Sequence, residues 1–211
     1  MFGLKIVTEK QVSFWKYIEN DYDAKCHQLR NHINEKEDKQ RFFQTLVSKL
    51  EGTGAAIHAI KQNKKGIDTY VCVIDRRSPE VDCRTNDAYM SGDVDLFVLN
   101  EDIYPSRIAM KYNDVPYLQA EFHGTDVKIC ELHSDVDGER YENCGYGTML
   151  VEALIAIAKK SGCNYVHGML SNVDAQTEDA KNKRNGFYRK RGFTLKFCDE
   201  EEKDGGLSMT L

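Results

Sequence analysis

A Gly-x-Gly turn that runs directly into an amphipathic helix pattern is the feature that most constrains this chain. The turn is Cys144-Gly145-Tyr146-Gly147, and the apolar residues after it recur at three- and four-residue spacings as far as Ala158. This periodicity predicts a helix, and Lys159 and Lys160 followed by Gly162 suit its C-terminus. Two glycines one residue apart leave backbone N–H groups uncovered at the positive end of that helix. The stretch therefore predicts an anion-binding site.

The composition narrows the class of protein in which this turn sits. The chain has 211 residues, 41% hydrophobic and 30% charged, which is ordinary for a globular protein with one sizeable core. Its net charge of -5 argues against a nucleic-acid binder. No apolar run reaches the ~18 residues that cross a bilayer, and the N-terminal residues do not have the pattern of a signal sequence. The seven cysteines are consistent with free thiols in a reducing compartment. We therefore expect a cytoplasmic protein without a nucleic-acid or membrane partner.

Apolar residues spaced by three or four predict helical structure across residues 8–50. A charged break at residues 34–38 separates two apolar stripes, which predicts a pair of helices. We expect the pair to pack on the core or to shape a substrate groove. The alternative is a helical hairpin that binds a partner.

Alternating patterns after this region predict strands. Residues 55–60 and 69–74 flank a polar turn and predict a β-hairpin, residues 75–93 are expected to form a loop, and residues 94–98 predict another strand.

The rest of the chain predicts a mixed α/β arrangement in one sheet, with residues 1–104 as an N-terminal region and residues 105–211 as the core. Three strands precede the glycine turn and the helix that begins there. A strand, a second helix and two further strands follow that helix. The expected strands are residues 108–112, 117–122, 127–132, 165–170, 193–197 and 207–211, and the expected helices are residues 148–160 and 181–191.

Two motifs in this core resemble the GNAT superfamily of acetyl-CoA-dependent N-acetyltransferases. Glu142-Asn143-Cys144-Gly145-Tyr146-Gly147 resembles the family's pyrophosphate loop, Arg/Gln-x-x-Gly-x-Gly/Ala, and residues 187–193 match its Phe-Tyr-x-x-x-Gly-Phe signature. The resemblance implies a GNAT-like fold with an N-terminal helical extension. Glu142 departs from the family pattern, and we expect its side chain to point away from the phosphates.

The resemblance also implies where acetyl-CoA is held. Backbone N–H groups of the turn would cradle the diphosphate. The backbone at the splayed end of the strand 127–132 would pair with the pantetheine arm, and an N–H there would polarise the thioester carbonyl. The alternative for the turn is an ordinary strand-to-helix connection. The implied cofactor-binding residues are Leu132, His133, Ser134, Asn143, Cys144, Gly145, Tyr146, Gly147 and Thr148.

Catalytic roles follow from the same resemblance. Tyr188 stands at the family's general-acid position, where its phenol would protonate the leaving thiolate; the alternative is a core tyrosine hydrogen-bonded across the sheet. Glu131 is the first candidate for the base that deprotonates the amine, because it is expected to share an apolar strand face with Val127 and Ile129 that raises its pKa. Glu121 is the second candidate. Either carboxylate could instead be a cross-strand ion-pair partner.

Other residues near the expected site have two interpretations each. Ser171 and Asp174 would bind the acceptor or simply cap the segment that follows. The basic run 181–191 is a solvated helix face or attracts the cofactor's ribose phosphate. No residues stand at metal-ligand spacing.

These patterns predict direct transfer of an acetyl group from acetyl-CoA to a primary amine in a ternary complex. The alternative is a non-catalytic acyl-CoA-binding or regulatory module. The acceptor is a small-molecule or protein amine, and the acidic residues 135–142 lean toward a cation. The apolar helix stripes could also pack between chains in a homodimer.

Overall fold

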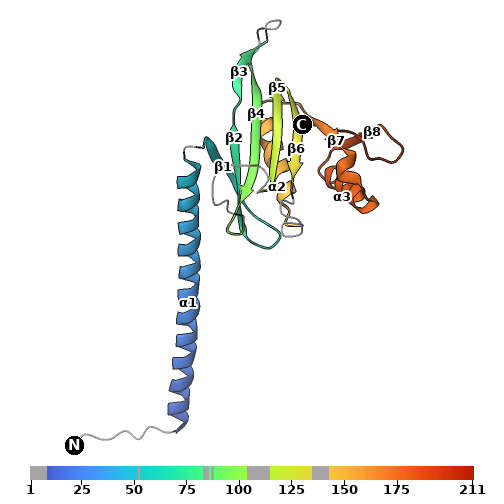
Figure 1. Cartoon of the computed structure of the whole chain (residues 1–211). Coiled ribbons are helices and arrows are strands. Elements are labelled where there is room, and N and C mark those ends of the chain that lie inside the picture. The colour runs from blue at the N-terminus through green and yellow to red at the C-terminus, as the bar shows by residue number, and fades with distance from the viewer. Residues whose placement is uncertain (1–8, 52, 83–85, 87, 104–114, 135–142) are drawn as a thin grey trace, which may run out of the picture. The chain divides into compact units, whose positions relative to one another are not determined.

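The protein is described here by a computed structural model that covers residues 9–51, 53–82, 86, 88–103, 115–134 and 143–211 (Figure 1). The chain divides into two compact units, residues 1–49 and residues 50–211. The boundary expected near residue 104 falls inside the second unit, and residues 104–114 lie outside the described part of the chain. The strand expected at residues 108–112 lies there too.

The first unit is a single helix, α1 (Glu9–Leu50), and the break expected at residues 34–38 is wrong. Charged residues in this interval are good helix formers, and no glycine or proline interrupts them. Pairs one turn apart, Lys25 with Asp21 and Arg41 with Asp38, add to the stability of the exposed helix surface. The expected pair of helices, and with it the alternative of a helical hairpin, is therefore absent from the described residues.

The second unit is built on a nine-stranded, mostly antiparallel sheet in the order β1-β2-β4-β5-β6-β7-β9-β8, with β3 paired to β4. One parallel pair, β6 with β7, interrupts the antiparallel pattern, because α2 crosses over between these strands. The mixed α/β class expected from the sequence is confirmed. The elements are β1 (Ala55–Gln62), β2 (Asp68–Asp75), β3 (Ser78–Val81), β4 (Ala88–Leu99), β5 (Tyr117–His123), β6 (Asp126–His133), α2 (Tyr146–Lys160), β7 (Tyr165–Leu170), a 3-10 turn (Asn172–Ala175), α3 (Glu178–Arg189), β8 (Thr194–Phe197) and β9 (Gly205–Thr210).

The stretch 75–93, expected to be a loop, instead forms β3 and the first part of β4. β3 is exposed along its length and the first part of β4 is only partly buried, so this stretch gives no hydrophobic alternation to detect. Arg77 fixes the chain where β2 ends: its guanidinium bonds Asp75 and the Ser161 hydroxyl, and it lies 4.3 Å from the centre of the Phe122 ring.

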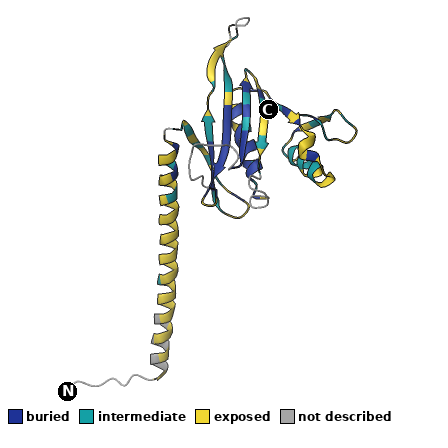
Figure 2. Ribbon diagram, in the orientation of Figure 1, coloured by how far each residue is buried: buried dark blue, intermediate teal, exposed yellow. Residues whose placement is uncertain are grey.

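The hydrophobic core lies between the sheet and α2. Buried residues concentrate on the central strands and on α2 (Figure 2). Alternate residues of β5, Leu118, Ala120 and Phe122, are buried together with Leu150 and Leu154 of α2. This packing holds the first turn of α2 beside the C-terminal end of β6, where the candidate site is found.

Candidate functional site

The parallel strands β6 and β7 separate part of the way along their length. They pair from Asp126 with Tyr165 to Ile129 with Gly168, and no further. Beyond that point β6 stays paired with β5, and β7 stays paired with β9 as far as Leu170. In the described chain, the edge of β6 after Ile129 therefore has no strand partner on the β7 side. Unpaired backbone groups on such an edge can bind an extended ligand as an added strand.

A β-bulge lies at the residue where the two strands part. Gln119 pairs with Glu131 and Ala120 pairs with Ile129, so Cys130 is an extra residue in β6. A bulge bends its strand and increases the local twist. This bend directs the end of β6 away from β7 and accounts for the opening.

The first turn of α2 offers free N–H groups beside this opening. Gly145 precedes the helix with φ 87°, a left-handed conformation that favours glycine, and no side chain caps the helix. Within the described chain, the N–H groups of Gly147 and Thr148 make no backbone hydrogen bond. These donors and the positive helix end provide the electrostatics for an anion.

Gly147 is where three elements meet. A Cβ atom at this position would lie 3.1 Å from Ser134 Cβ, just after β6, and 3.2 Å from Phe187 Cε2 in α3. A side chain here would require Ser134 or Phe187 to shift by a few tenths of an ångström. The structure thus brings together the turn, the end of β6 and the second motif, as the sequence led us to expect.

The side chain of Tyr146 ends in a buried polar cluster. Its hydroxyl accepts hydrogen bonds from Asn63 Nδ2 and Asn100 Nδ2, each at 3.0 Å. Asn100 Nδ2 also donates to Thr69 Oγ1 at 3.3 Å. All four residues are buried, so the cluster anchors the first residue of α2 to three strand ends.

Tyr188 lies in α3 between two phenylalanines. Its ring centre is 5.0 Å from that of Phe187 and 5.7 Å from that of Phe193, both edge-on. Burial raises the pKa of Tyr188 to about 12, and the nearby Asp174 carboxylate adds to the shift. Among the described residues its hydroxyl has no hydrogen-bond partner, so the cross-sheet bond of the alternative interpretation is not found there.

The apolar environment expected for Glu131 is not found, and the bulge explains why. The extra residue Cys130 reverses the alternation, so Glu131 lies opposite Gln119 on the sheet face away from Val127 and Ile129. Its side chain is 46% exposed, and its carboxylate lies 3.0 Å from His133 Nε2.

Glu121 lies on the same polar face and forms an ion pair. Lys128 Nζ is 3.3 Å from its carboxylate, and His123 Nε2 is 3.6 Å away. The hydrogen bond from Lys128 lowers the pKa of Glu121. This cross-strand pairing matches the alternative that we kept for the two carboxylates.

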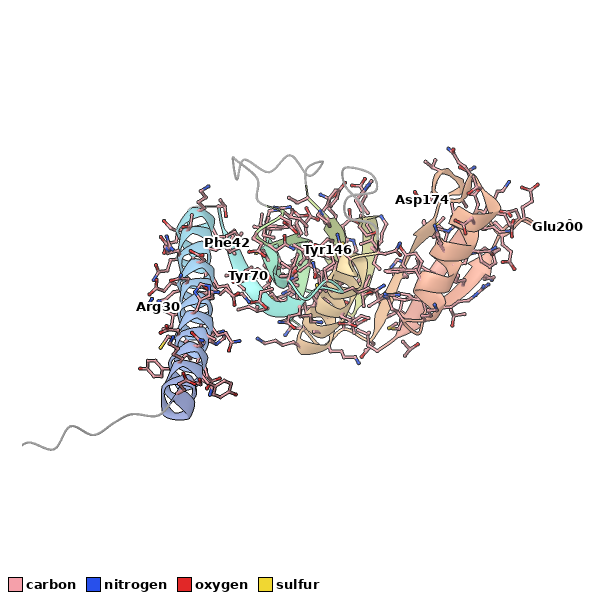
Figure 3. The ribbon with its side chains drawn as sticks, turned by 90° about the horizontal axis from the view of Figure 1, so that it is seen from below. Arg30, Phe42, Tyr70, Tyr146, Asp174 and Glu200 are labelled. Carbon is pink, nitrogen blue, oxygen red and sulfur yellow. The ribbon has the colours of Figure 1, made fainter. Side chains whose placement is uncertain are left out.

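The Ser171 side chain caps the segment that follows it, which is one of its two interpretations. Its hydroxyl accepts the N–H of Val173 at 3.2 Å and so begins the 3-10 turn. Asp174 in that turn is exposed beside α3 (Figure 3).

The basic run 181–191 is largely engaged within the protein. Arg184 donates to the carbonyls of Ser171, Lys203 and Glu202. Arg191 donates to Thr148 Oγ1 and to the Phe187 carbonyl, with its guanidinium 3.7 Å from the centre of the Phe187 ring. Arg191 thereby links the second motif to the first turn of α2.

Some expectations fall on residues outside the described ranges. Glu142 and the acidic residues 135–142 are among them. The described residues contain no group of three metal-ligating side chains. No helix in this part of the chain is both long and apolar enough to cross a bilayer.

Sequence reasoning missed the cluster around Tyr146. Asn63 and Asn100 lie 83 and 46 residues away from it in the sequence, in segments that read only as a polar turn and a strand end. The apolar run that ends at Leu99 gives no sign that the asparagine after it is buried.

A family profile and several solved structures are similar to parts of this chain. Residues 109–193 match the profile of the Acetyltransferase (GNAT) family. Among solved structures, the chain is similar to an acetyltransferase from Bacillus cereus ATCC 14579, with 19% identity, a TM-score of 0.41, and coverage of 57% of this chain and 74% of that one. It is also similar to the PaiA N-acetyltransferase from Thermoplasma acidophilum in complex with coenzyme A, with 14% identity, a TM-score of 0.38, and coverage of 56% and 60%. The GNAT domain of S. lividans PAT gives 13% identity, a TM-score of 0.45, and coverage of 72% and 96%.

No curated protein sequence matches the chain significantly. Both motifs that carried the resemblance lie inside the matched residues 109–193. The resemblance of this chain to the GNAT acetyltransferases is therefore confirmed.

Proposed function

We propose that this protein is an N-acetyltransferase that moves an acetyl group directly from acetyl-CoA to a primary amine in a ternary complex. The family match supports acyl transfer from coenzyme A in general. The observation that carries the proposal is the opening between β6 and β7, which begins after Ile129 and lies beside the uncapped first turn of α2. Such an arrangement fits a long ligand with an anionic portion and an extended amide arm.

The residues at this opening fit the cofactor. The N–H groups of Gly147 and Thr148 would hold the diphosphate at the positive end of α2. The free edge of β6 at Leu132, His133 and Ser134 would bind the pantetheine arm as an added strand. Bound acetyl-CoA supplies the acetyl group as a thioester.

A backbone N–H on the same edge would stabilise the negative charge that develops on the thioester oxygen during attack. Tyr188 would donate its proton to the sulfur that leaves. The phenol is protonated at neutral pH, as an ordinary tyrosine is, so the proton is available when the thiolate forms. Burial raises the pKa of Tyr188 to about 12, which makes the phenol a weaker acid than an exposed tyrosine.

Glu131 is the stronger candidate for the base. Glu121 is paired with Lys128, which lowers its pKa and weakens it as a proton acceptor. Glu131 bonds an imidazole instead, and His133 stacks on Tyr117 with ring centres 4.9 Å apart. We propose that Glu131 accepts the proton of the ammonium substrate, directly or through a water molecule.

Release of free thiol from acetyl-CoA tests the proposal against a panel of polyamines, aminoglycosides, amino acids and peptides. We expect release that depends on the amine. Glu131→Gln and Tyr188→Phe should each lower turnover by about 10²-fold, the usual contribution of a general acid or base. Unchanged turnover in both variants would show that these roles are wrong.

The same screen separates the alternative. Acetyl-CoA that protects against thermal unfolding, without thiol release for any amine, would favour a non-catalytic acyl-CoA-binding module. If millimolar acetyl-CoA neither protects against unfolding nor binds in calorimetry, the chain has the fold but does not bind the cofactor.

A further inference from the structure

The turn between β1 and β2 lies against the glycine turn that precedes α2. The Lys64 N–H donates to the Cys144 carbonyl at 3.1 Å, just before Gly145, and Asn63 Nδ2 donates to the Tyr146 hydroxyl just after it. An ion pair between Lys61 and Glu152 adds a third link between β1 and α2. The hairpin is thus attached to the loop on both sides of Gly145.

The β1–β2 turn is itself held in one conformation. Asn63 Oδ1 accepts the N–H groups of Lys65 at 2.9 Å and Ile67 at 3.0 Å, and the Asn63 N–H donates to the Ile67 carbonyl at 3.0 Å. Asn63 is buried at 5% exposure. The backbone of Lys64 is therefore positioned by a network that does not involve its side chain.

The Lys64 side chain runs across Gly145. An ideal Cβ on Gly145 would lie 3.5 Å from Lys64 Cγ and 3.7 Å from Lys64 Cε. The ammonium, one bond beyond Cε, therefore lies beside the turn. Within the described chain, Lys64 has no ion-pair partner.

We propose that Lys64 is a further cofactor-binding residue, whose ammonium contacts the diphosphate of coenzyme A from the β1–β2 turn. This inference rests on the proposed function. Lys64 lies outside the matched residues 109–193. It would add a side-chain cation to the backbone N–H groups that the glycine turn before α2 offers to the diphosphate. The position that holds Arg or Gln in the family pattern is Glu142 here, so the loop sequence itself supplies no cation.

Calorimetric binding of coenzyme A to the full chain tests the proposal. Lys64→Met keeps the aliphatic stem over Gly145 and the backbone bond to Cys144 but removes the charge. We expect about 10-fold weaker binding, the low end for a charge-assisted hydrogen bond because this lysine is exposed. The loss should shrink in about 0.3 M salt, where exposed charges are screened. Lys65→Met, an exposed neighbour in the same turn, is the matched control and should change the affinity less than 2-fold, well below the ~10-fold loss expected of a direct contact.

Two truncated ligands locate the contact. Dephospho-coenzyme A retains the diphosphate, so the loss caused by Lys64→Met should persist with it. Acetyl-pantetheine has no diphosphate, so wild type and Lys64→Met should bind it equally.

Equal coenzyme A affinity in Lys64→Met and Lys65→Met would overturn the proposal while leaving the function intact. A loss that disappears with dephospho-coenzyme A would overturn it too, because the contact would then be to the 3′-phosphate. Absence of coenzyme A binding in the wild type would instead overturn the proposed function.

Discussion

Replacing Tyr146 by phenylalanine removes a single oxygen from the buried cluster that anchors α2. That oxygen accepts one hydrogen bond from Asn63 and one from Asn100, each 3.0 Å long. Tyr146 is 2% exposed, Asn63 5% and Asn100 0%, so water cannot readily replace the lost acceptor. Asn100 keeps its bond to Thr69, whereas Asn63 Nδ2 has no other acceptor in the described part of the chain.

The cost can be worked from these contacts. The bond lost from Asn100, which keeps its bond to Thr69, costs about 0.5–1.5 kcal/mol net, and the Asn63 amide donor left unpaired costs about 1–3 kcal/mol. We therefore expect Tyr146→Phe to lower the free energy of unfolding by about 2–4 kcal/mol. For a chain of this size, each kcal/mol shifts Tm by roughly 2–4 °C, which gives a decrease of about 4–16 °C.

Thermal and urea unfolding followed by circular dichroism measure this effect. Tyr165→Phe is the matched control, because Tyr165 is 38% exposed and stacks on His167 without a buried hydroxyl bond. Its loss should be within about 0.5 kcal/mol of zero, as for other surface changes. If Tyr146→Phe is no less stable than this control, the cluster does not anchor α2 and the reasoning is refuted.

Three further predictions concern the site. Gly147→Ala places a methyl group against Ser134 and Phe187, so it should lower the free energy of unfolding by about 1–3 kcal/mol and weaken coenzyme A binding. Gly186→Ala in α3 is the control, because a Cβ there meets nothing within 4 Å; it should be neutral or stabilising in the same assays. Tyr188→Phe should lower kcat with little change in the KM for acetyl-CoA, since the hydroxyl acts on the leaving sulfur; an increase in KM alone would mean that it only packs. The folded-state pKa of Tyr188, about 12, lies above the ~10 of an unfolded tyrosine. Stability from this proton is therefore complete below pH ~10 and is lost as pH rises from ~10 toward 12, so wild type should lose stability relative to Tyr188→Phe over this interval in urea titrations. A constant difference would contradict the raised pKa.

Local periodicity was enough to predict most of the second unit. The hairpin of β1 and β2, the antiparallel pair β5 and β6, and the helices α2 and α3 follow from alternation and from three- and four-residue spacing. These patterns are reliable because each element buries one face against the core. The same reasoning failed at residues 75–93, where β3 is exposed along its whole length and has no buried face to encode.

The break predicted in α1 failed for a related reason. Charges at residues 34–38 interrupt an apolar stripe, but they do not interrupt a helix, because lysine and glutamate have high helix propensity. Loss of amphipathic patterning marks a change in what a helix packs against. Only glycine, proline or a capping residue marks its end.

The two motifs predicted where the candidate site lies in the sequence. They gave no information about the residues that contact the glycine turn from distant segments. Asn63, Lys64 and Asn100 reach the glycine turn from strand ends that precede residue 109, where the family match begins. Their side chains carry no local signature, because polar residues at strand ends are common. Only the strand order of the sheet brings them beside α2.

One inserted residue links the shape of the opening to the chemistry expected there. Cys130 adds a position to β6 that strict alternation does not anticipate, and it does so one residue after pairing with β7 ends. The bend frees the backbone edge that would receive an extended ligand. It also places Glu131 on the polar face of the sheet instead of the core face. There its neighbour is His133, not an apolar surface. If Glu131 is the base, it therefore acts from this polar face, beside His133 and the bound substrate, and not from an apolar wall.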